Sequence, residues 1–346
     1  MSDSQQRFLV IRMSSIGDIV HALPAVAALG RAYPQAEIHW VVESRYAGLL
    51  AGNPYVRNVL RLDTLGWREH GLSAATLEEI GRGVLALREF SYDAAIDFQG
   101  LWKSAFIARL SRSQKRLGLA ERWLREPSAA VFYTERVSPA GRTHVIDQYY
   151  ALAERLGARE GQHEFPLPRA PEDDRYVDCQ LAVREASDFM IVNPGGGWQA
   201  KCWSPENYAE LIRELGPVFP GKVLLTGSPE EQALISEILT GAATKQACYF
   251  PSTLAQFIAL VRRAKLFVGG DTGPLHLAAA VGTPIVAVYG PTDPARNGPF
   301  APEDIALSAS GPINHTRRAV HPSYITRVPV HAVLGAIAER LARAHG

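Results

Sequence analysis

Cysteine is scarce in this chain of 346 residues, and its spacing excludes several classes of protein. The three cysteines, Cys179, Cys202 and Cys248, are odd in number and form no CxxC pair. This pattern disfavours both a disulfide framework and a zinc site. It is typical of a protein that works in a reducing cytoplasm.

Long hydrophobic runs are also absent. No uninterrupted apolar stretch approaches the roughly 20 residues that a membrane-spanning helix needs. The first residues, MSDSQQRFLVIRM, lead directly into a predicted strand, so we expect no signal peptide. We therefore expect a soluble cytoplasmic protein, which can still work at a membrane surface.

The chain has no excess of charge of either sign. Its 36 Lys and Arg and 35 Asp and Glu give a formal net charge of +1. We therefore expect no general attraction to nucleic acid, and an anionic ligand must be held by local charges. The apolar fraction of 47% is ordinary for a globular protein. A chain of this length favours two domains over one core.

Apolar runs alternate with helical patterns along most of the chain, which predicts an α/β fold with parallel strands. The predicted strands are Phe8–Met13, Glu37–Val42, Val59–Leu62, Ala94–Asp97, Phe189–Asn193, Lys222–Thr226, Leu266–Gly269 and Ile285–Tyr289. The predicted helices are Ile19–Ala32, Leu77–Glu89, Trp102–Leu110, Pro205–Leu215, Pro229–Leu239, Leu254–Arg263, Pro274–Val281 and Val330–His345.

A polar, proline-bearing segment, Gly157–Arg175, interrupts this alternation and is the expected linker. The chain is thus predicted to form two Rossmann-like halves, with parallel sheets facing across a cleft. Ligands of such sheets bind at the carboxyl ends of the strands.

The most informative stretch is VGGDTGPLHLAAAVGTPIVAVYGPTDP, residues 268–294. A predicted strand ends in two glycines, Asp271 and Thr272 follow, and Gly273 opens a helix of small residues. A helix N-terminus presents unpaired N–H groups and partial positive charge, which suits a phosphate or diphosphate. His276 lies four residues after Thr272, which places both side chains on one helix face. Packed histidines are common in such helices, so a phosphate contact and a structural role stay open.

Three other loops carry candidate residues. Asp18 stands in the first turn of the first predicted helix, where it is either a favourable helix-terminal charge or a general base. Lys201 follows the Gly195–Gly197 run and is either a phosphate contact or a solvated lysine. Glu231 completes a capping box with Ser228, which leaves helix capping and ribose binding as alternatives. The glycines match neither the dinucleotide fingerprint nor the P-loop.

These motifs together resemble those of the ADP-heptose:lipopolysaccharide heptosyltransferases. The resemblance rests on four segments in order: SSIGDIVHALPA (14–25), YDAAIDFQGLWKSA (92–105), the glycine-rich loop with Lys201, and GGDTGPLHLAAAVGTPIVAVYGPTDP (269–294). REPSAAVFY (125–133) adds a likeness to the members that transfer the first heptose to the Kdo of lipid A. The resemblance spans nearly the whole chain.

This resemblance implies a GT-B fold. Residues 1–165 would form a Rossmann-like acceptor domain, and residues 180–328 a Rossmann-like nucleotide-sugar domain. The final helix, residues 329–346, would pack back on the first domain. It also implies inversion at the anomeric carbon, ADP-heptose as substrate, and no metal or other cofactor.

The resemblance also implies roles for the candidate residues. Asp18 would be the catalytic base, with Lys201 stabilising the diphosphate. Donor contacts would come from Lys201, Glu231, Asp271, Thr272, Gly273 and His276. Acceptor contacts would come from Ser15, Gly17, Arg61, Arg68, Gln99, Lys103 and Arg125. The acceptor would be Kdo-lipid A, and the enzyme would be peripheral to the inner face of the cytoplasmic membrane.

Alternatives remain at this point. One is a transferase of the same fold that acts on a heptose or on another glycan. Another is a non-catalytic nucleotide-sugar-binding protein, in which Asp18 is only a helix cap. A nicotinamide dehydrogenase is poorly supported, because GxGxxG is missing after the first strand. The oligomeric state is open.

Overall fold

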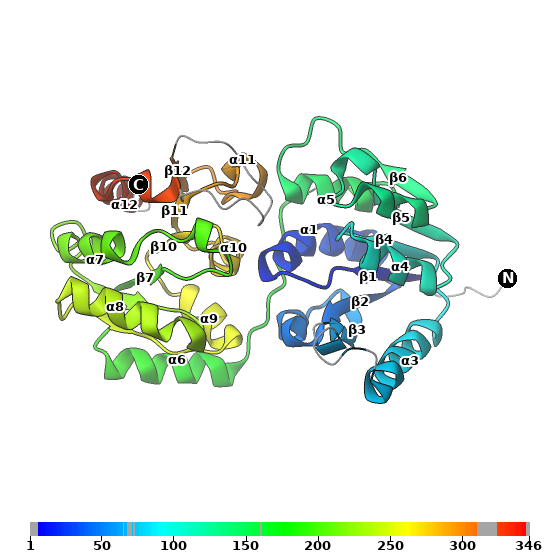
Figure 1. The fold of residues 1–346 in the computed structure, drawn as a ribbon, viewed down its shortest axis with the longest axis horizontal. Helices are drawn as coiled ribbons and strands as arrows, with labels where there is room; N and C mark the ends of the chain where they lie inside the picture. Colours follow the sequence, from blue (N-terminus) through cyan, green and yellow to red (C-terminus); the bar gives the residue numbers. More distant parts are fainter. Residues whose placement is uncertain are drawn as a thin grey trace. The chain divides into compact units, whose positions relative to one another are not determined.

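The computed structural model describes residues 6–343 apart from residues 65, 68–70, 72, 160 and 310–323. The chain divides into two compact units, Met1–Pro168 and Arg169–Gly346 (Figure 1). The division lies inside the segment expected to be a linker. Among the described residues, no helix combines the length and the apolar character needed to span a bilayer.

The first unit contains a six-stranded parallel sheet in the order β3-β2-β1-β4-β5-β6. Its strands are β1 (Arg7–Ile11), β2 (Glu37–Glu43), β3 (Val56–Leu62), β4 (Ala94–Asp97), β5 (Lys115–Leu119) and β6 (Glu135–Val137). Its helices are α1 (Ile16–Ala32), α3 (Ala74–Arg88), α4 (Trp102–Leu110) and α5 (Val145–Glu154), with the 3₁₀ helices η1 (Ser44–Leu50), η2 (Glu121–Trp123) and η3 (Pro127–Phe132). α1 packs against α5, and α3 against α4.

The second unit repeats this topology with the order β12-β11-β10-β7-β8-β9. Its strands are β7 (Phe189–Asn193), β8 (Lys222–Leu225), β9 (Ala247–Tyr249), β10 (Phe267–Gly270), β11 (Ile285–Tyr289) and β12 (Ile305–Ser308). Its helices are α6 (Pro171–Val183), α7 (Pro205–Glu214), α8 (Gln232–Ala242), α9 (Leu254–Val261), α10 (Gly273–Ala280), α11 (Pro294–Asn297) and α12 (Val330–Arg343), with η4 (Gln199–Lys201), η5 (Pro229–Glu231) and η6 (Tyr324–Arg327).

Both sheets have the strand order of dinucleotide-binding domains, in which the order of the parallel strands reverses between the first and the fourth strand of the unit. The central strands are almost wholly buried, as their apolar runs predict. The prediction of two Rossmann-like domains with parallel sheets is therefore confirmed. In each unit, the loops that follow the strands meet at the carboxyl edge of the sheet.

Two elements bear on the expected domain organisation. α6 begins at Pro171, inside the expected linker, because a proline at the first helical position and three acidic residues in the first turn favour a helix start. α12 packs on α7, β11 and β12 of its own unit, where Val333 and Ile337 join the buried core. Its expected packing on the first domain stays a prediction.

Candidate functional site

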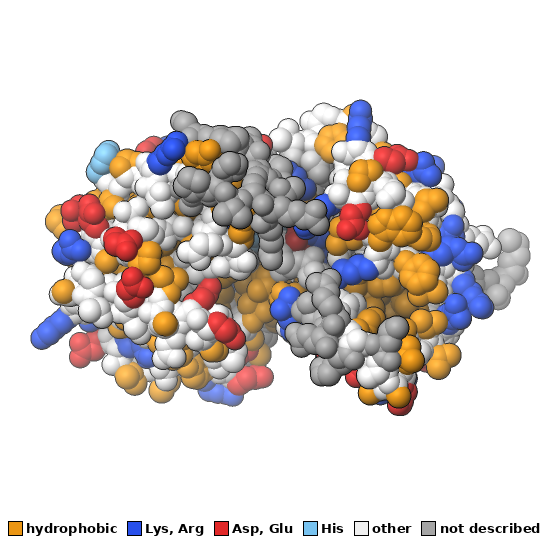
Figure 2. Space-filling view, in the orientation of Figure 1, with side chains coloured by type: hydrophobic (Ala, Val, Ile, Leu, Met, Phe, Trp, Pro, Cys, Tyr) orange, Lys and Arg blue, Asp and Glu red, His pale blue; other side chains and the backbone are white. Residues whose placement is uncertain are grey.

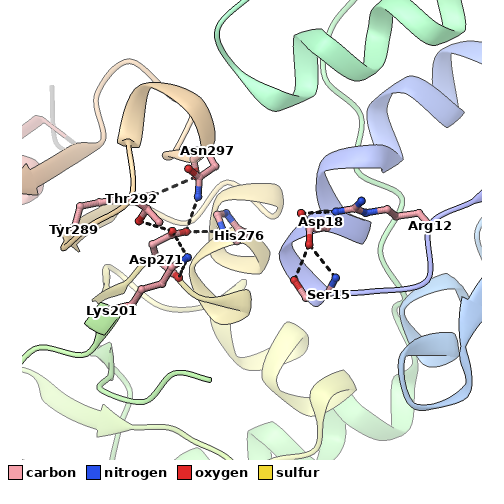
Figure 3. Close-up of polar contacts among 9 residues, drawn as sticks. All are labelled: Arg12, Ser15, Asp18, Lys201, Asp271, His276, Tyr289, Thr292 and Asn297. Carbon is pink, nitrogen blue, oxygen red and sulfur yellow. Dashed lines mark hydrogen bonds and ion pairs between the residues drawn. The ribbon is translucent and has the colours of Figure 1, made fainter. Parts of the chain in front are cut away.

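A buried carboxylate organises the carboxyl edge of the second sheet. Asp271 follows β10 and is 3% exposed. Lys201 Nζ and Thr292 Oγ1 donate to its Oδ2 at 2.5 Å and 2.7 Å. Asn297 Nδ2 donates to Oδ1 at 2.8 Å, and His276 Nε2 lies 3.1 Å from the same oxygen (Figure 3). Asp271 thus joins residues from four separate segments.

The charges around Asp271 keep it ionised. Burial acts to raise its pKa, but the hydrogen bond and charge of His276 and the ammonium of Lys201 outweigh burial. The pKa of Asp271 therefore lies well below its usual range. The aspartate in turn fixes the Lys201 ammonium, which also bonds the Asp271 carbonyl oxygen at 3.2 Å and keeps 21% of its side chain exposed.

Glycines let the loop after β7 lie against the neighbouring strand ends. A Cβ at Gly195 would lie 2.0 Å from the Glu231 carboxylate, and one at Gly196 would lie 2.9 Å from Thr272 Cγ2. At Gly270 a Cβ would approach the carbonyl oxygen of Lys201 to 2.5 Å. The glycine-rich run is therefore a packing requirement, which places Lys201 and Glu231 at one sheet edge.

Glu231 acts as a helix cap in this structure. Its Oε2 accepts a hydrogen bond from the Ser228 backbone N–H at 2.8 Å, which completes the predicted capping box. Its other oxygen, Oε1, lies beside Gly195, because a Cβ built on Gly195 would lie 2.0 Å from this oxygen. Capping occupies only one of the two carboxylate oxygens, so the structure leaves the second role open.

Thr272 is the N-cap residue of α10, and its hydroxyl is buried without a hydrogen-bond partner among the described residues. A buried polar group normally finds a partner, so this hydroxyl is a candidate for contact with a ligand. Gly273 and Pro274 follow as the first helical residues, so the N–H groups of this turn face the same edge. The ring nitrogen Nε2 of His276, expected to contact phosphate, faces Asp271 in this structure.

The first unit has its own polar centre at the carboxyl end of β1. Ser15 is the N-cap of α1, and Asp18 stands at N3 (Figure 3). Asp18 Oδ2 accepts hydrogen bonds from the Ser15 backbone N–H at 3.0 Å and from its hydroxyl at 2.9 Å. Asp18 Oδ1 pairs with Arg12 Nη2 at 2.5 Å, and the side chain stays 41% exposed. Asp18 is therefore a helix cap and an accessible carboxylate at once.

The other expected acceptor residues occupy different places. Gly17 is buried in the first turn of α1, and Gln99 Oε1 accepts a hydrogen bond from the Met13 N–H at 2.8 Å. Arg61 on β3 and Arg125 after η2 are exposed. Arg68 lies outside the described residues.

Lys103 leads to a buried acid that the sequence analysis missed. Its Nζ lies 3.5 Å from Glu43 Oε1 and donates to Thr64 Oγ1 at 3.2 Å. Glu43 is 2% exposed at the end of β2 and also accepts from the Thr64 N–H. Its position as the last residue of a buried apolar run was the available signal.

Two members of the Asp271 cluster were also missed. Thr292 and Asn297 belong to the turn after β11 and to α11, and each donates directly to Asp271. Thr292 lies within the informative stretch 268–294, but nothing in the local sequence marks its side chain, and Asn297 lies beyond that stretch. Among the residues that the structure describes, no group of three or more His, Cys, Asp or Glu is placed to hold a metal ion.

The family model of glycosyltransferase family 9 (heptosyltransferase) matches residues 81–323. The chain belongs to this family. It is therefore a glycosyltransferase, as the motifs indicated. This family 9 chain is 30% identical to lipopolysaccharide heptosyltransferase 1 of Pseudomonas aeruginosa over 309 residues, 88% of this chain and 84% of that protein. It is also 30% identical to lipopolysaccharide heptosyltransferase 1 of Escherichia coli strain K12, over 88% of this chain and 93% of that protein.

Solved structures agree with this assignment. The family 9 chain is similar to E. coli heptosyltransferase WaaC with ADP, with a TM-score of 0.80 at 27% identity, over 97% of this chain and 100% of that chain. A glycosyl transferase of family 9 from Veillonella parvula gives a TM-score of 0.84 at 20% identity over 99% of both chains, which shows the fold alone. The predicted GT-B fold is confirmed.

Proposed function

We propose that this protein transfers L-glycero-D-manno-heptose from ADP-heptose to the Kdo of a lipid A precursor, with inversion and without a metal ion. The likeness to two lipopolysaccharide heptosyltransferases 1 and to a heptosyltransferase with ADP supports the donor and the pathway step. The reaction is the first heptose addition of the lipopolysaccharide inner core. We place it at the inner face of the cytoplasmic membrane, where the lipid acceptor is held.

The second unit supplies the donor site in this proposal, and one observation carries it. Asp271 holds the Lys201 ammonium, and the hydroxyl of the next residue, Thr272 at the start of α10, is buried without a hydrogen-bond partner in the described part of the chain. Departure of ADP leaves negative charge on the diphosphate, and positive groups fixed in advance stabilise that charge without reorganisation. Lys201, Thr272 and the Gly273 N–H would meet the phosphates, and Glu231 would accept hydrogen bonds from the ribose hydroxyls.

We assign His276 and Asp271 to the support of this donor site. His276 lies against Asp271, whose carboxylate is already bonded by four side chains. These contacts hold the Lys201 ammonium and the first turn of α10 in place. A direct phosphate contact of His276 would require its ring to leave Asp271.

Asp18 is the general base in this proposal. The Kdo hydroxyl attacks the anomeric carbon on the face opposite ADP, its proton passes to the Asp18 carboxylate, and ADP leaves with the electrons of the broken C–O bond. A single displacement of this kind inverts the anomeric carbon. The ion pair with Arg12 favours the ionised, proton-accepting form of Asp18. Ser15, Gly17, Arg61, Arg68, Gln99, Lys103 and Arg125 are assigned to the acceptor.

A crossed transfer assay tests the proposal. The purified protein is incubated with ADP-heptose or other nucleotide sugars, and with Kdo₂-lipid A or heptosylated lipid A. We expect product only from ADP-heptose and Kdo₂-lipid A, with the anomeric configuration opposite to that of the donor. Activity that persists in a chelator supports the metal-free reaction. Transfer only to heptosylated lipid A would assign a later step, and donor binding without transfer would make the protein a binding module.

A further inference from the structure

α4 has an unusual outer surface for a helix packed on a sheet. Its inner stripe is small and buried, with Ala105 and Ala108 at 0% exposure. Its outer stripe carries Trp102, Phe106 and Arg109, which are spaced four and three residues apart and therefore share one face. Trp102 is 47% exposed and Phe106 is 49% exposed. Water-facing positions of such a helix are usually polar, so exposed aromatic side chains at these positions indicate a binding surface.

η3 extends the apolar surface. The ring of Phe132 contacts Trp102 edge-on at 5.1 Å between centroids and Phe106 at 5.9 Å. Val131 beside it is 65% exposed. We call Trp102, Phe106, Val131 and Phe132 the α4–η3 apolar face. Figure 2 shows hydrophobic side chains gathered on this unit, with Lys and Arg side chains at their margin.

Internal contacts fix the polar edge of Trp102. Its indole N–H donates to Ser128 Oγ at 2.9 Å, and its backbone N–H donates to Glu126 at 2.7 Å. The indole N–H is therefore satisfied inside the protein, and the ring can enter an apolar environment without losing a hydrogen bond to water.

Positive charge is concentrated in the segment that carries this face. Residues 101–137 carry eight Lys and Arg against three Glu, a net charge of +5, whereas the whole chain carries +1. The exposed cations of this segment are Arg109, Arg112, Lys115, Arg122, Arg125 and Arg136, the last of which pairs with Glu121. Aromatic side chains bordered by exposed cations complement a bilayer surface, where rings enter the headgroup region and cations meet anionic lipids.

We propose that the α4–η3 apolar face docks the protein on an anionic lipid bilayer. The inference rests on the proposed function, because an enzyme that acts on a lipid-anchored acceptor must reach the membrane. It adds the residues that make the contact. Docking uses aromatic insertion and cation attraction together, so it depends both on the aromatic side chains and on anionic lipid.

Vesicle cosedimentation tests the docking directly, without donor or acceptor. Phosphatidylcholine vesicles with and without phosphatidylglycerol are mixed with the wild-type protein and with a Trp102→Ser, Phe106→Ser double variant. We expect wild-type binding that requires phosphatidylglycerol and weakens with salt, and a loss of about tenfold or more in the variant. Leu85→Ser and Val183→Ser, at residues 70% and 74% exposed, are matched controls that should bind as the wild type does.

Further arms separate the outcomes. An Arg109→Glu, Arg122→Glu variant should also lose binding to the anionic vesicles. Transfer to a deacylated, water-soluble Kdo acceptor should be unchanged in the double variant. The vesicle assay needs no transfer, so its result still tests the docking if the proposed transfer reaction is not found. Equal vesicle binding by wild type and double variant would overturn the proposal. A wild-type dimer that becomes monomeric in the variant, with vesicle binding unchanged, would assign the face to a second copy instead.

Discussion

The guanidinium of Arg12 lies 2.5 Å from the carboxylate of Asp18. Arg12 is 7% exposed and Asp18 is 41% exposed, so a buried cation holds a carboxylate that solvent reaches. Arg12 Nη1 also donates to the Phe98 carbonyl oxygen at 2.9 Å, which ties its position to the end of β4. Burial lowers the pKa of Arg12, but the charge and hydrogen bond of Asp18 and the charges of Tyr149 and Asp97 together outweigh burial, so the pKa is raised. The guanidinium therefore stays charged.

Asp18→Asn tests the general base while keeping the helix cap. The asparagine carbonyl oxygen can still accept from Ser15, but the side chain no longer takes a proton at neutral pH. We expect kcat to fall by about 10²- to 10⁴-fold while ADP-heptose still binds, as measured by calorimetry and steady-state kinetics. Asp147→Asn, at another first-turn carboxylate of the same unit, is the control and should keep full activity. A fully active Asp18→Asn enzyme would leave Asp18 as a cap alone.

Arg12 is expected to be a positioning residue for Asp18. Arg12→Met removes the fork that joins Asp18 to the Phe98 carbonyl oxygen, and a small displacement of a catalytic group lowers kcat by about 10²-fold. The KM for ADP-heptose should stay unchanged. Arg12→Lys should recover part of kcat, because the ammonium keeps the charge but lacks the planar fork. Thermal unfolding checks that the variants fold, and an unchanged kcat in a folded Arg12→Met enzyme contradicts the role.

Glu231→Gln separates helix capping from ribose binding. The amide oxygen of glutamine can still accept from the Ser228 N–H, so we expect the unfolding temperature to change little. A carboxylate that binds ribose hydroxyls contributes about 1.5–3 kcal/mol, so its loss should weaken ADP binding by roughly 10- to 100-fold. Gln256→Ala is the control, because Gln256 completes the capping box of α9 and should affect stability alone. Unchanged ADP affinity in Glu231→Gln would assign Glu231 to capping only.

The sequence predicted most of the sheet scaffold for a clear physical reason. Central parallel strands are buried on both faces and therefore read as continuous apolar runs, as in β7, β10 and β11. Outer strands are short and partly exposed, so β6 and β9, at three residues each, have no such signature and were missed. β5 and β12 are also only partly buried and were missed for the same reason.

The candidate site was predictable only in part. Asp271 and Lys201 stood out because a strand end and a glycine-rich loop mark them, and the structure joins them directly. Thr292 and Asn297 reach Asp271 because β11 lies beside β10, and local sequence does not encode which way a turn residue points. Glu43 was hidden for a related reason, since its burial depends on Lys103 and Thr64 from distant segments.

The Asp271 cluster predicts how stability depends on pH. The folded protein holds the pKa of Asp271 far below the value of about 3.9 expected in the unfolded chain. The group therefore contributes stability that is fully present above about pH 4, and this contribution is lost progressively as the pH falls further toward the folded pKa.

Asp271→Asn should lower the free energy of unfolding of the second unit by about 3–5 kcal/mol at neutral pH, since it leaves buried partners unpaired. The difference from wild type should shrink as the pH falls below about 4, because the unfolded wild-type chain then binds a proton at Asp271 that the folded protein, with its lowered pKa, does not bind. Urea unfolding between about pH 3 and pH 7 measures both curves. Asp188→Asn, at an aspartate 53% exposed, should follow the wild-type curve throughout. A constant gap between the wild-type and Asp271→Asn curves would show that the Asp271 charge contributes nothing to the acid dependence.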